Sequence, residues 1–439
     1  MGWRRVISES GLTGRVRIGE FAGMLFRWLA LLFCSAALLR AADWPQWRGP
    51  FRNGHTPPGV EIAQLPAEPK VNWRRKIGEG LASPVGAGAV VVYADNQSGK
   101  ESVHAANLND GQTIWSATLD DAFKDSQGPQ GPRCTPLIDG DLVYAQSCKG
   151  ELKCLSLKDG RQLWHANYLQ DFGAIFIGEK GQAQGASRHG YNGSPVIDGE
   201  RLIVVAGGTN GAGVVCFNKK TGKVLWKSQN DPAAYAAPVI EQLAGARQVI
   251  AFTAVSLLGL NPETGDLLWR IPLKTTFARH AVTPVVIRDK VYVSSHEWGL
   301  LAVQIQRKNS RFEATRIWTN KEAALNFASP VASGEFLYGV GPKKNIVCVD
   351  GQSGRMAWSK DGYFTSSADK AWASLILAGG NLLILTDGGE LVMLKDDPQQ
   401  AVEIGRAQVC GFNWCQPAII NSKLVLRDRT DLVCLQLAP

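Results

Sequence analysis

The chain has 439 residues, a formal net charge of +8 and 20% charged residues. The first 42 residues hold six Arg and two Glu, so the remainder carries 41 basic and 37 acidic residues, a net charge of +4. No basic stripe with interleaved aromatic residues follows, which excludes the electrostatic pattern of a nucleic-acid-binding protein. The length would ordinarily indicate two or three domains, unless a repeat closes the chain into one unit.

Residues 1–42 are predicted to be a secretory signal peptide. Residues 28–39 form an uncharged apolar run of 12 residues, preceded by Arg27 and followed by Ala41-Ala42. Such a run is too short to cross a bilayer, and its flanks are those of a signal peptide. Met24 is an alternative start, because the segment from there to Ala42 is itself a compact signal peptide. We therefore expect a periplasmic or secreted protein without a transmembrane segment in the mature chain.

The rest of the chain repeats one pattern, in which a strand opens on Ser-Pro or a related dipeptide and a later Gly turn runs into Trp. The turn-to-Trp half reads LNDGQTIW (108–115), LKDGRQLW (157–164), NKKTGKVLW (218–226), NPETGDLLW (261–269) and GQSGRMAW (351–358). The second residue of each opening dipeptide falls at 84, 136, 195, 238, 284, 330, 375 and 417. A unit of about 45 residues with four short strands is one propeller blade. Residues 43–439 are thus predicted to form one all-β, eight-bladed propeller.

The two ends of the repeat region are complementary. The last unit stops at LVCLQLAP (432–439) without a Trp strand, whereas KVNWRRKI (70–77) has the Trp but no strands before it. We expect the strand around Trp73 to complete the last blade, which would leave no open sheet edge between the first and last blades. A solenoid is the structural alternative, but it would need capping repeats rather than two half-blades.

With these motifs, the chain resembles the bacterial pyrroloquinoline-quinone-like propellers. This family includes the quinoprotein alcohol dehydrogenases and the lipoprotein that helps to assemble outer-membrane β-barrels. The resemblance covers nearly all of 43–439 and includes DWPQWRGP (43–50), RHGYNGSPVIDGERLIV (188–204) and RDRTDLVCL (427–435). It implies the fold, but function must be argued from a site.

Nine cysteines in an exported chain invite a disulfide interpretation, but most occupy matching repeat positions. Matching positions on different blades do not approach disulfide distance, and a free Cys packs well as a small buried residue. The spacing of Cys410 and Cys415 leaves one local disulfide open.

The candidate binding surface is the face at which the chain enters each innermost strand, because residues there surround the central channel. Aromatic, guanidinium and amide groups around a concave mouth suit a planar anionic or polyhydroxylated ligand, or an extended peptide. The alternative is that these large side chains only fill the channel. The Trp at each blade end is instead expected to pack between blades. The predicted site residues are Arg133, His189, Tyr191, Arg279, His280, Asn326, Trp372 and Trp414.

Signals for catalysis are sparse. The chain has no adjacent cysteines, and carboxylates are scarce just before the opening dipeptides. We expect no catalytic residue, no metal site and no cofactor. The predicted function is a monomeric, non-catalytic ligand-binding or protein-interaction scaffold of the cell envelope, whose partner is a small molecule, a glycan or an envelope protein. The alternative is a dehydrogenase of alcohols or sugars that depends on pyrroloquinoline quinone and Ca²⁺.

Overall fold

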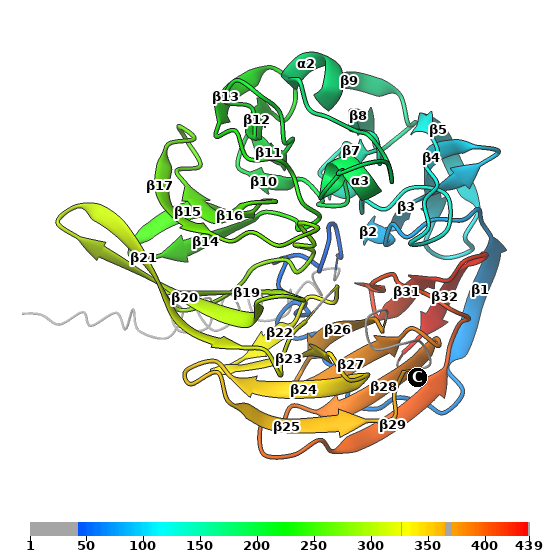
Figure 1. Cartoon of the computed structure of the whole chain (residues 1–439). Coiled ribbons are helices and arrows are strands. Elements are labelled where there is room, and N and C mark those ends of the chain that lie inside the picture. The colour runs from blue at the N-terminus through cyan, green and yellow to red at the C-terminus, as the bar shows by residue number, and fades with distance from the viewer. Residues whose placement is uncertain (1–42, 326, 365–370, 438–439) are drawn as a thin grey trace, which may run out of the picture. The chain divides into compact units, whose positions relative to one another are not determined.

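Eight four-stranded antiparallel sheets form a ring in the computed structural model (Figure 1), which describes residues 43–325, 327–364 and 371–437. The predicted eight-bladed propeller is confirmed. The segment predicted to be a signal peptide lies outside the described residues, and so does Asn326. None of the described helices is long and apolar enough to span a membrane.

The blades are numbered here in chain order, and each runs from the channel outward. Blades 1 to 4 consist of β2 (Val85–Ala87), β3 (Val90–Gln97), β4 (Lys100–Asn107) and β5 (Thr113–Asp121); β6 (Leu137–Asp139), β7 (Leu142–Gln146), β8 (Glu151–Ser156) and β9 (Gln162–Asn167); β10 (Val196–Asp198), β11 (Arg201–Val205), β12 (Val214–Asn218) and β13 (Val224–Ser228); and β14 (Val239–Leu243), β15 (Ala246–Phe252), β16 (Ser256–Leu260) and β17 (Leu267–Pro272).

Blades 5 to 8 repeat the arrangement. They consist of β18 (Val285–Ile287), β19 (Lys290–Ser295), β20 (Gly299–Lys308) and β21 (Arg311–Asn320); β22 (Val331–Ser333), β23 (Phe336–Gly341), β24 (Asn345–Asp350) and β25 (Met356–Asp361); β26 (Ala373–Ala378), β27 (Asn381–Thr386), β28 (Glu390–Lys395) and β29 (Glu403–Gln408); and β30 (Ala418–Ile420), β31 (Lys423–Arg427), β32 (Asp431–Gln436) and β1 (Lys70–Lys76). The helices α2 (Tyr168–Phe172) and α3 (Ala186–His189) lie in the long connection between blades 2 and 3.

Neighbouring blades are joined by a recurring contact between a Trp and a Gly. Trp115 of blade 1 donates its indole N–H to the carbonyl oxygen of Leu157 in blade 2, at 2.7 Å. Its ring packs so close to Gly160 that a Cβ on this glycine would lie only 2.6 Å from a carbon atom of the ring. Gly160 has a φ of +71°, a conformation that glycine adopts without steric cost. Equivalent Trp–Gly contacts join Trp164 to Gly222, Trp226 to Gly265, Trp318 to Gly354 and Trp73 to Gly111. The prediction that these Trp residues pack between blades is confirmed.

Trp269 at the end of blade 4 departs from this pattern. Blade 5 has no Gly turn, because its third and fourth strands, β20 and β21, continue into a long hairpin that projects from the ring (Figure 1). The Trp269 indole instead donates to Gln248 of its own blade, at 2.6 Å. A Cβ at Gly259 would lie 2.2 Å from that indole nitrogen, so the glycine makes room for the ring.

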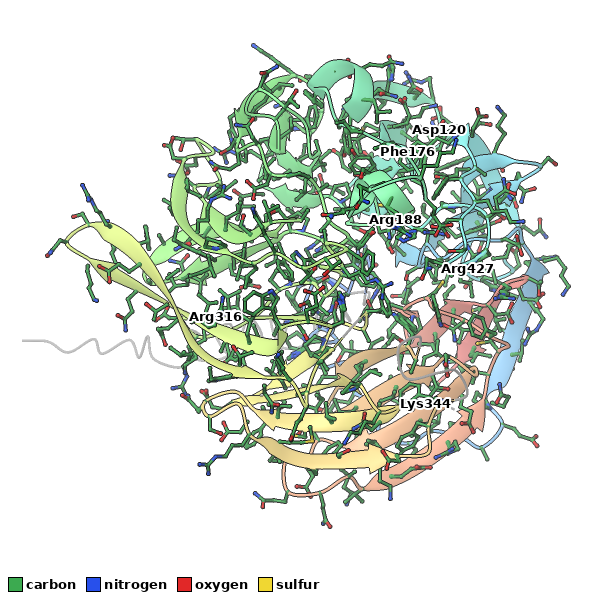
Figure 2. The ribbon with its side chains drawn as sticks, in the orientation of Figure 1. Asp120, Phe176, Arg188, Arg316, Lys344 and Arg427 are labelled. Carbon is green, nitrogen blue, oxygen red and sulfur yellow. The ribbon has the colours of Figure 1, made fainter. Side chains whose placement is uncertain are left out.

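The ring closes as predicted, because β1 pairs with β32 as the outermost strand of blade 8. Trp73 then donates to the Leu108 carbonyl oxygen of blade 1 at 2.8 Å, which repeats the contact between successive blades. Arg427 (Figure 2) is fully buried beside this junction and donates to the carbonyl oxygens of Ala94 and Gly78. The first and last segments of the described chain therefore form one interface.

The segment before β1 has a second role, because residues 43–56, here called the plug, lie in the middle of the ring (Figure 1). Arg52 donates to the carbonyl oxygens of Ser194 and Pro195 at 3.0 and 2.7 Å, and Arg48 donates to that of Pro330. These are main-chain acceptors at the inner edges of sheets, which need a partner when buried. Further hydrogen bonds join the plug to Gly86, Ile138, Thr283 and Leu377. The plug thus ties together the innermost strands of six blades.

All eight cysteines in the described part of the chain are free and buried. They include Cys410 and Cys415, so the local disulfide that their spacing allowed is not formed. Their role as small packing residues agrees with the expectation from their repeat positions.

Candidate ligand-binding site at the channel mouth

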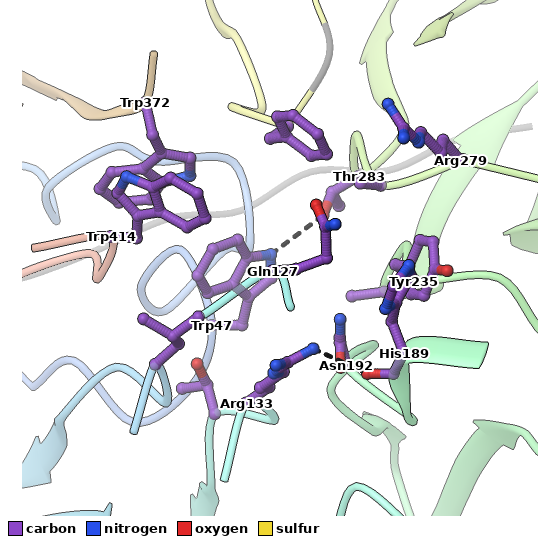
Figure 3. Close-up of a pocket in the computed structure, with 15 residues that line it drawn as sticks. Trp47, Gln127, Arg133, His189, Asn192, Tyr235, Arg279, Thr283, Trp372 and Trp414 are labelled. Carbon is purple, nitrogen blue, oxygen red and sulfur yellow. Dashed lines mark hydrogen bonds between the residues drawn. The ribbon is translucent and has the colours of Figure 1, made fainter. Parts of the chain in front are cut away.

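A cavity of about 320 Å³ opens at the channel mouth, and the plug residue Trp47 forms part of its lining (Figure 3). Every blade contributes the residue three positions before the second residue of its opening dipeptide. These eight residues are Leu81, Arg133, Asn192, Tyr235, Ala281, Phe327, Trp372 and Trp414. The lining therefore includes one register position of every blade, which carries seven kinds of side chain because blades 7 and 8 both have Trp.

Five of the predicted site residues line this cavity, namely Arg133, His189, Arg279, Trp372 and Trp414. Tyr191 and His280 lie one position earlier in the repeat than the lining residue. Successive side chains of an extended segment point to opposite sides, and these two are buried in the protein instead. The ring of His280 stacks on Phe252 with centroids 4.2 Å apart, and burial lowers its pKa to about 4. Tyr191 packs edge-on against Tyr168.

One wall of the cavity is fixed by a network of charged groups around Asp125. Arg133 donates to both carboxylate oxygens of Asp125, at 2.7 and 2.6 Å, and to the main-chain oxygen of His189. Burial alone would raise the pKa of Asp125, but the hydrogen bonds from His189 and Arg133 outweigh it and hold that pKa well below its usual range. The network keeps both Arg133 and His189 in place at the cavity wall.

This network also fixes the hydrogen-bonding direction of His189. Its Nδ1 lies 2.8 Å from Asp125 Oδ2, and because an ionised carboxylate only accepts, Nδ1 is the donor. In a neutral imidazole the other nitrogen, Nε2, is then an acceptor. His189 thus presents an oriented hydrogen-bonding group from the wall that also carries Asn192 and Tyr235 (Figure 3).

Several polar atoms of the lining residues lack a partner within the described part of the chain. They are Asn192 Oδ1, Tyr235 OH, Trp414 Nε1 and Arg133 Nε. Buried polar atoms without a hydrogen bond are rare in folded proteins and cost about 1–3 kcal/mol each. All four atoms belong to residues of the lining, but each has almost no accessible surface, so a ligand in the cavity would reach them only after the lining moves.

The charge of the mouth is positive. Arg279 stacks on Phe277, 5.2 Å from the ring centroid, and forms no ion pair with any residue that the structure describes. Beneath the mouth, burial lowers the pKa of Arg48 and of Arg52 to about 9, so both remain charged at neutral pH. Both donate to main-chain carbonyl oxygens (Arg52 also to the side-chain oxygen of Gln46), and neither has a carboxylate partner among the described residues.

The chain matches a known protein family. The model of the family described as outer membrane protein assembly factor BamB matches residues 68–172 and 100–360. The chain belongs to this family. It is 24% identical over 369 residues to BamB of Burkholderia pseudomallei (strain K96243), covering 82% of this chain and 75% of that protein. It is 22% identical over 371 residues to BamB of Salmonella typhimurium, covering 73% and 87%. The family resemblance seen in the motifs is confirmed.

Solved structures agree on the fold. BamB from Moraxella catarrhalis superposes with a TM-score of 0.53 at 13% identity, covering 83% of this chain and 98% of that one. Quinohemoprotein alcohol dehydrogenase from Comamonas testosteroni superposes with a TM-score of 0.63 at 12% identity, covering 92% and 81%. At such identities the superpositions show a shared propeller and nothing about chemistry.

The lining residues do not fit a quinone cofactor held by Ca²⁺. A hard cation needs several oxygen ligands, usually with carboxylates among them. Among the residues that the structure describes, none that lines the cavity is an Asp or Glu, and the nearby Asp125 is already bound by Arg133 and His189. Within the described residues, no group of three or more His, Cys, Asp or Glu side chains could hold a metal ion.

Trp47 and Gln127 also line the cavity, but they were not among the predicted site residues. Trp47 donates its indole N–H to Thr283 of blade 5 at 2.9 Å (Figure 3). A signal for its role was present in DWPQWRGP, which carries two Trp and an Arg but no strand pattern. Gln127 lies in the long connection between blades 1 and 2, where no repeat position identifies it.

Proposed function

We propose that this protein is a non-catalytic scaffold of the bacterial cell envelope that binds its partner at the channel mouth. The observation that carries the proposal is the cavity itself, which is built by all eight blades and is lined by aromatic, guanidinium and amide side chains. Membership of the BamB family supports the envelope location, because the relatives are named as outer membrane protein assembly factors. The signal-like segment at 1–42 agrees with export.

The chemistry of the lining favours binding over catalysis. A general acid–base site needs a titratable group beside a reacting group, and a nucleophile needs an adjacent base. The two lining threonine hydroxyls are already acceptors, Thr135 for the backbone N–H of Ser83 and Thr283 for the indole of Trp47. His189 is the imidazole at the wall, and within the described part of the chain no lining Ser, Cys or carboxylate accompanies it.

The experiment is deletion of the gene in its own bacterium, with outer-membrane β-barrel proteins quantified by mass spectrometry. We expect their amounts to fall several-fold and to be restored by the unaltered gene. A gene carrying both Arg279→Ala and Trp414→Ala should restore them poorly, although the purified variant melts within a few degrees of the unaltered protein. Unchanged barrel proteins in the deletion strain would overturn the proposed scaffold role.

A further inference from the structure

The polar side chains that line the mouth both donate and accept hydrogen bonds. Arg133 and Arg279 can only donate, whereas Gln127 and Asn192 each carry a donor and an acceptor. A ligand with several hydroxyl groups supplies both kinds of partner, since each hydroxyl donates one hydrogen bond and accepts two.

The same cavity offers apolar surfaces of the size of a ring. Trp47, Trp372 and Trp414 line it, and Trp414 packs against the cluster that contains Trp372. Large, rigid aromatic faces bury the apolar face of a ligand at little cost in side-chain entropy. A ligand with an apolar face and a rim of hydroxyl groups, as a sugar ring has, meets both the aromatic and the polar lining.

The charges select among sugars. Three guanidinium groups (Arg188, Arg133 and Arg279) and the carboxylate of Asp125 act on Tyr235. Arg188 and Arg279 both stack on Phe277, at 5.7 and 5.2 Å from the ring centroid. Asp125 is bound by Arg133, Glu179 lies near His189 and Glu297 near His296. Arg279 lines the cavity without an ion pair among the described residues, so a carboxylate on the ligand can pair with it.

We propose that the cavity binds an acidic sugar of the uronic acid class, as a free molecule or as the end of a longer glycan. The carboxylate pairs with Arg279, the ring packs on Trp414 and Trp372, and the hydroxyl groups bond to Gln127, Asn192 and His189. A volume of about 320 Å³ is at the small end for ligand pockets, which suits the end of a chain rather than its middle. This inference rests on the proposed binding role of the mouth and names the ligand's chemistry.

Calorimetric titration of the purified protein with D-glucuronate and D-galacturonate tests the proposal, with glucose and galactose as neutral controls. A charge-assisted hydrogen bond contributes about 1.5–3 kcal/mol. We therefore expect at least one acid to bind about 10–100-fold more tightly than its neutral counterpart. Arg279→Gln should remove this difference by weakening the binding of the acid. Binding of the acids no tighter than of the neutral sugars, or no binding of any of the four, would overturn the proposal.

Two further variants separate recognition from folding. Trp414→Phe keeps an aromatic ring but removes the indole N–H, so it should weaken the binding of acidic and neutral sugars alike. Arg307→Gln removes an exposed cation on the hairpin of blade 5, where it stacks on Phe312, and should change neither affinity. Failure of sugar binding with a reduced level of barrel proteins in the deletion strain would refute only the sugar, whereas normal barrel proteins would refute the scaffold role.

Discussion

The contribution of a buried ionisable side chain to folding stability depends on pH, and Glu101 is the clearest case. Its side chain is fully buried between blades 1 and 2, where it accepts the backbone N–H of Cys148 at 3.0 Å. Burial raises its pKa from 4.5 to about 7. The folded protein thus keeps a proton that the unfolded chain loses, so the stability due to this group is present below pH 4.5 and is lost as pH rises through 7.

We predict that Glu101→Gln flattens the dependence of stability on pH. The pKa difference corresponds to roughly 3 kcal/mol, so the variant should be more stable than the unaltered protein at pH 8 by up to that amount. At pH 4 the two should differ little. Urea unfolding at several pH values measures this, with Glu322→Gln on the surface as the matched control. Parallel pH profiles for the Glu101 variant and the unaltered protein would contradict the prediction.

The sequence allowed some of the residues that line the mouth to be predicted. The repeat register predicted the segment that enters each blade, and five of the eight predicted residues line the cavity. Tyr191 and His280 were included because they lie in the same segments, but alternation in an extended chain turns them away. Counting positions from the opening dipeptide would have distinguished these two residues from the lining residues. In all eight blades, the residue three positions before the second residue of the dipeptide lines the cavity.

At the scale of elements, the contact between blades is the unit that repeats. An indole N–H reaches a carbonyl oxygen of the next blade, and a glycine with positive φ makes room for the ring. Blade 5 shows how the contact depends on the turn, because its long β20–β21 hairpin leaves Trp269 to bond within blade 4. Trp73 of strand β1 makes the same contact where the two ends of the described chain meet.

Trp73→Ala should therefore weaken the closure of the ring. Truncation of a buried Trp costs about 3–5 kcal/mol, and here the Leu108 carbonyl oxygen also loses its donor. Val71 lies in the same strand but is 48% exposed, so Val71→Ala should change stability by no more than about 0.5 kcal/mol. Thermal unfolding of both variants checks this. Equal melting temperatures would mean that the Trp73 contact does not hold the ring closed.

For the whole molecule, the plug lies in the middle of the ring and joins its blades. Its two buried arginines bond to the main chain of separate parts of the ring, and its Trp47 lines the cavity. The cavity is therefore an assembly of nine segments that no single blade could form. The same architecture in a quinohemoprotein alcohol dehydrogenase shows that the propeller does not decide the chemistry.

We expect no Ca²⁺-dependent binding of pyrroloquinoline quinone by the whole protein. The described lining of the cavity offers cationic and aromatic groups but no carboxylate for the metal. Calorimetric titration with the quinone, with and without Ca²⁺, is the measurement. Weak binding that is equal in both conditions and is lost in Arg279→Gln would reflect the positive mouth alone. Tight binding only with Ca²⁺ would contradict the prediction and restore the dehydrogenase alternative.

The sequence by itself determined the number of blades, the closing strand and the interblade Trp, because each depends on a local pattern that recurs at a fixed spacing. Only the tertiary structure decided the position of the plug beneath the cavity and the pairing of the charged side chains at the cavity wall. The plug has no repeat to align it, and its contacts with Thr283 and Pro330 span more than 200 residues of sequence. The pairing of Asp125 with Arg133 and His189 likewise joins separate loops, and it leaves Arg279 as a lining cation without an ion pair among the described residues.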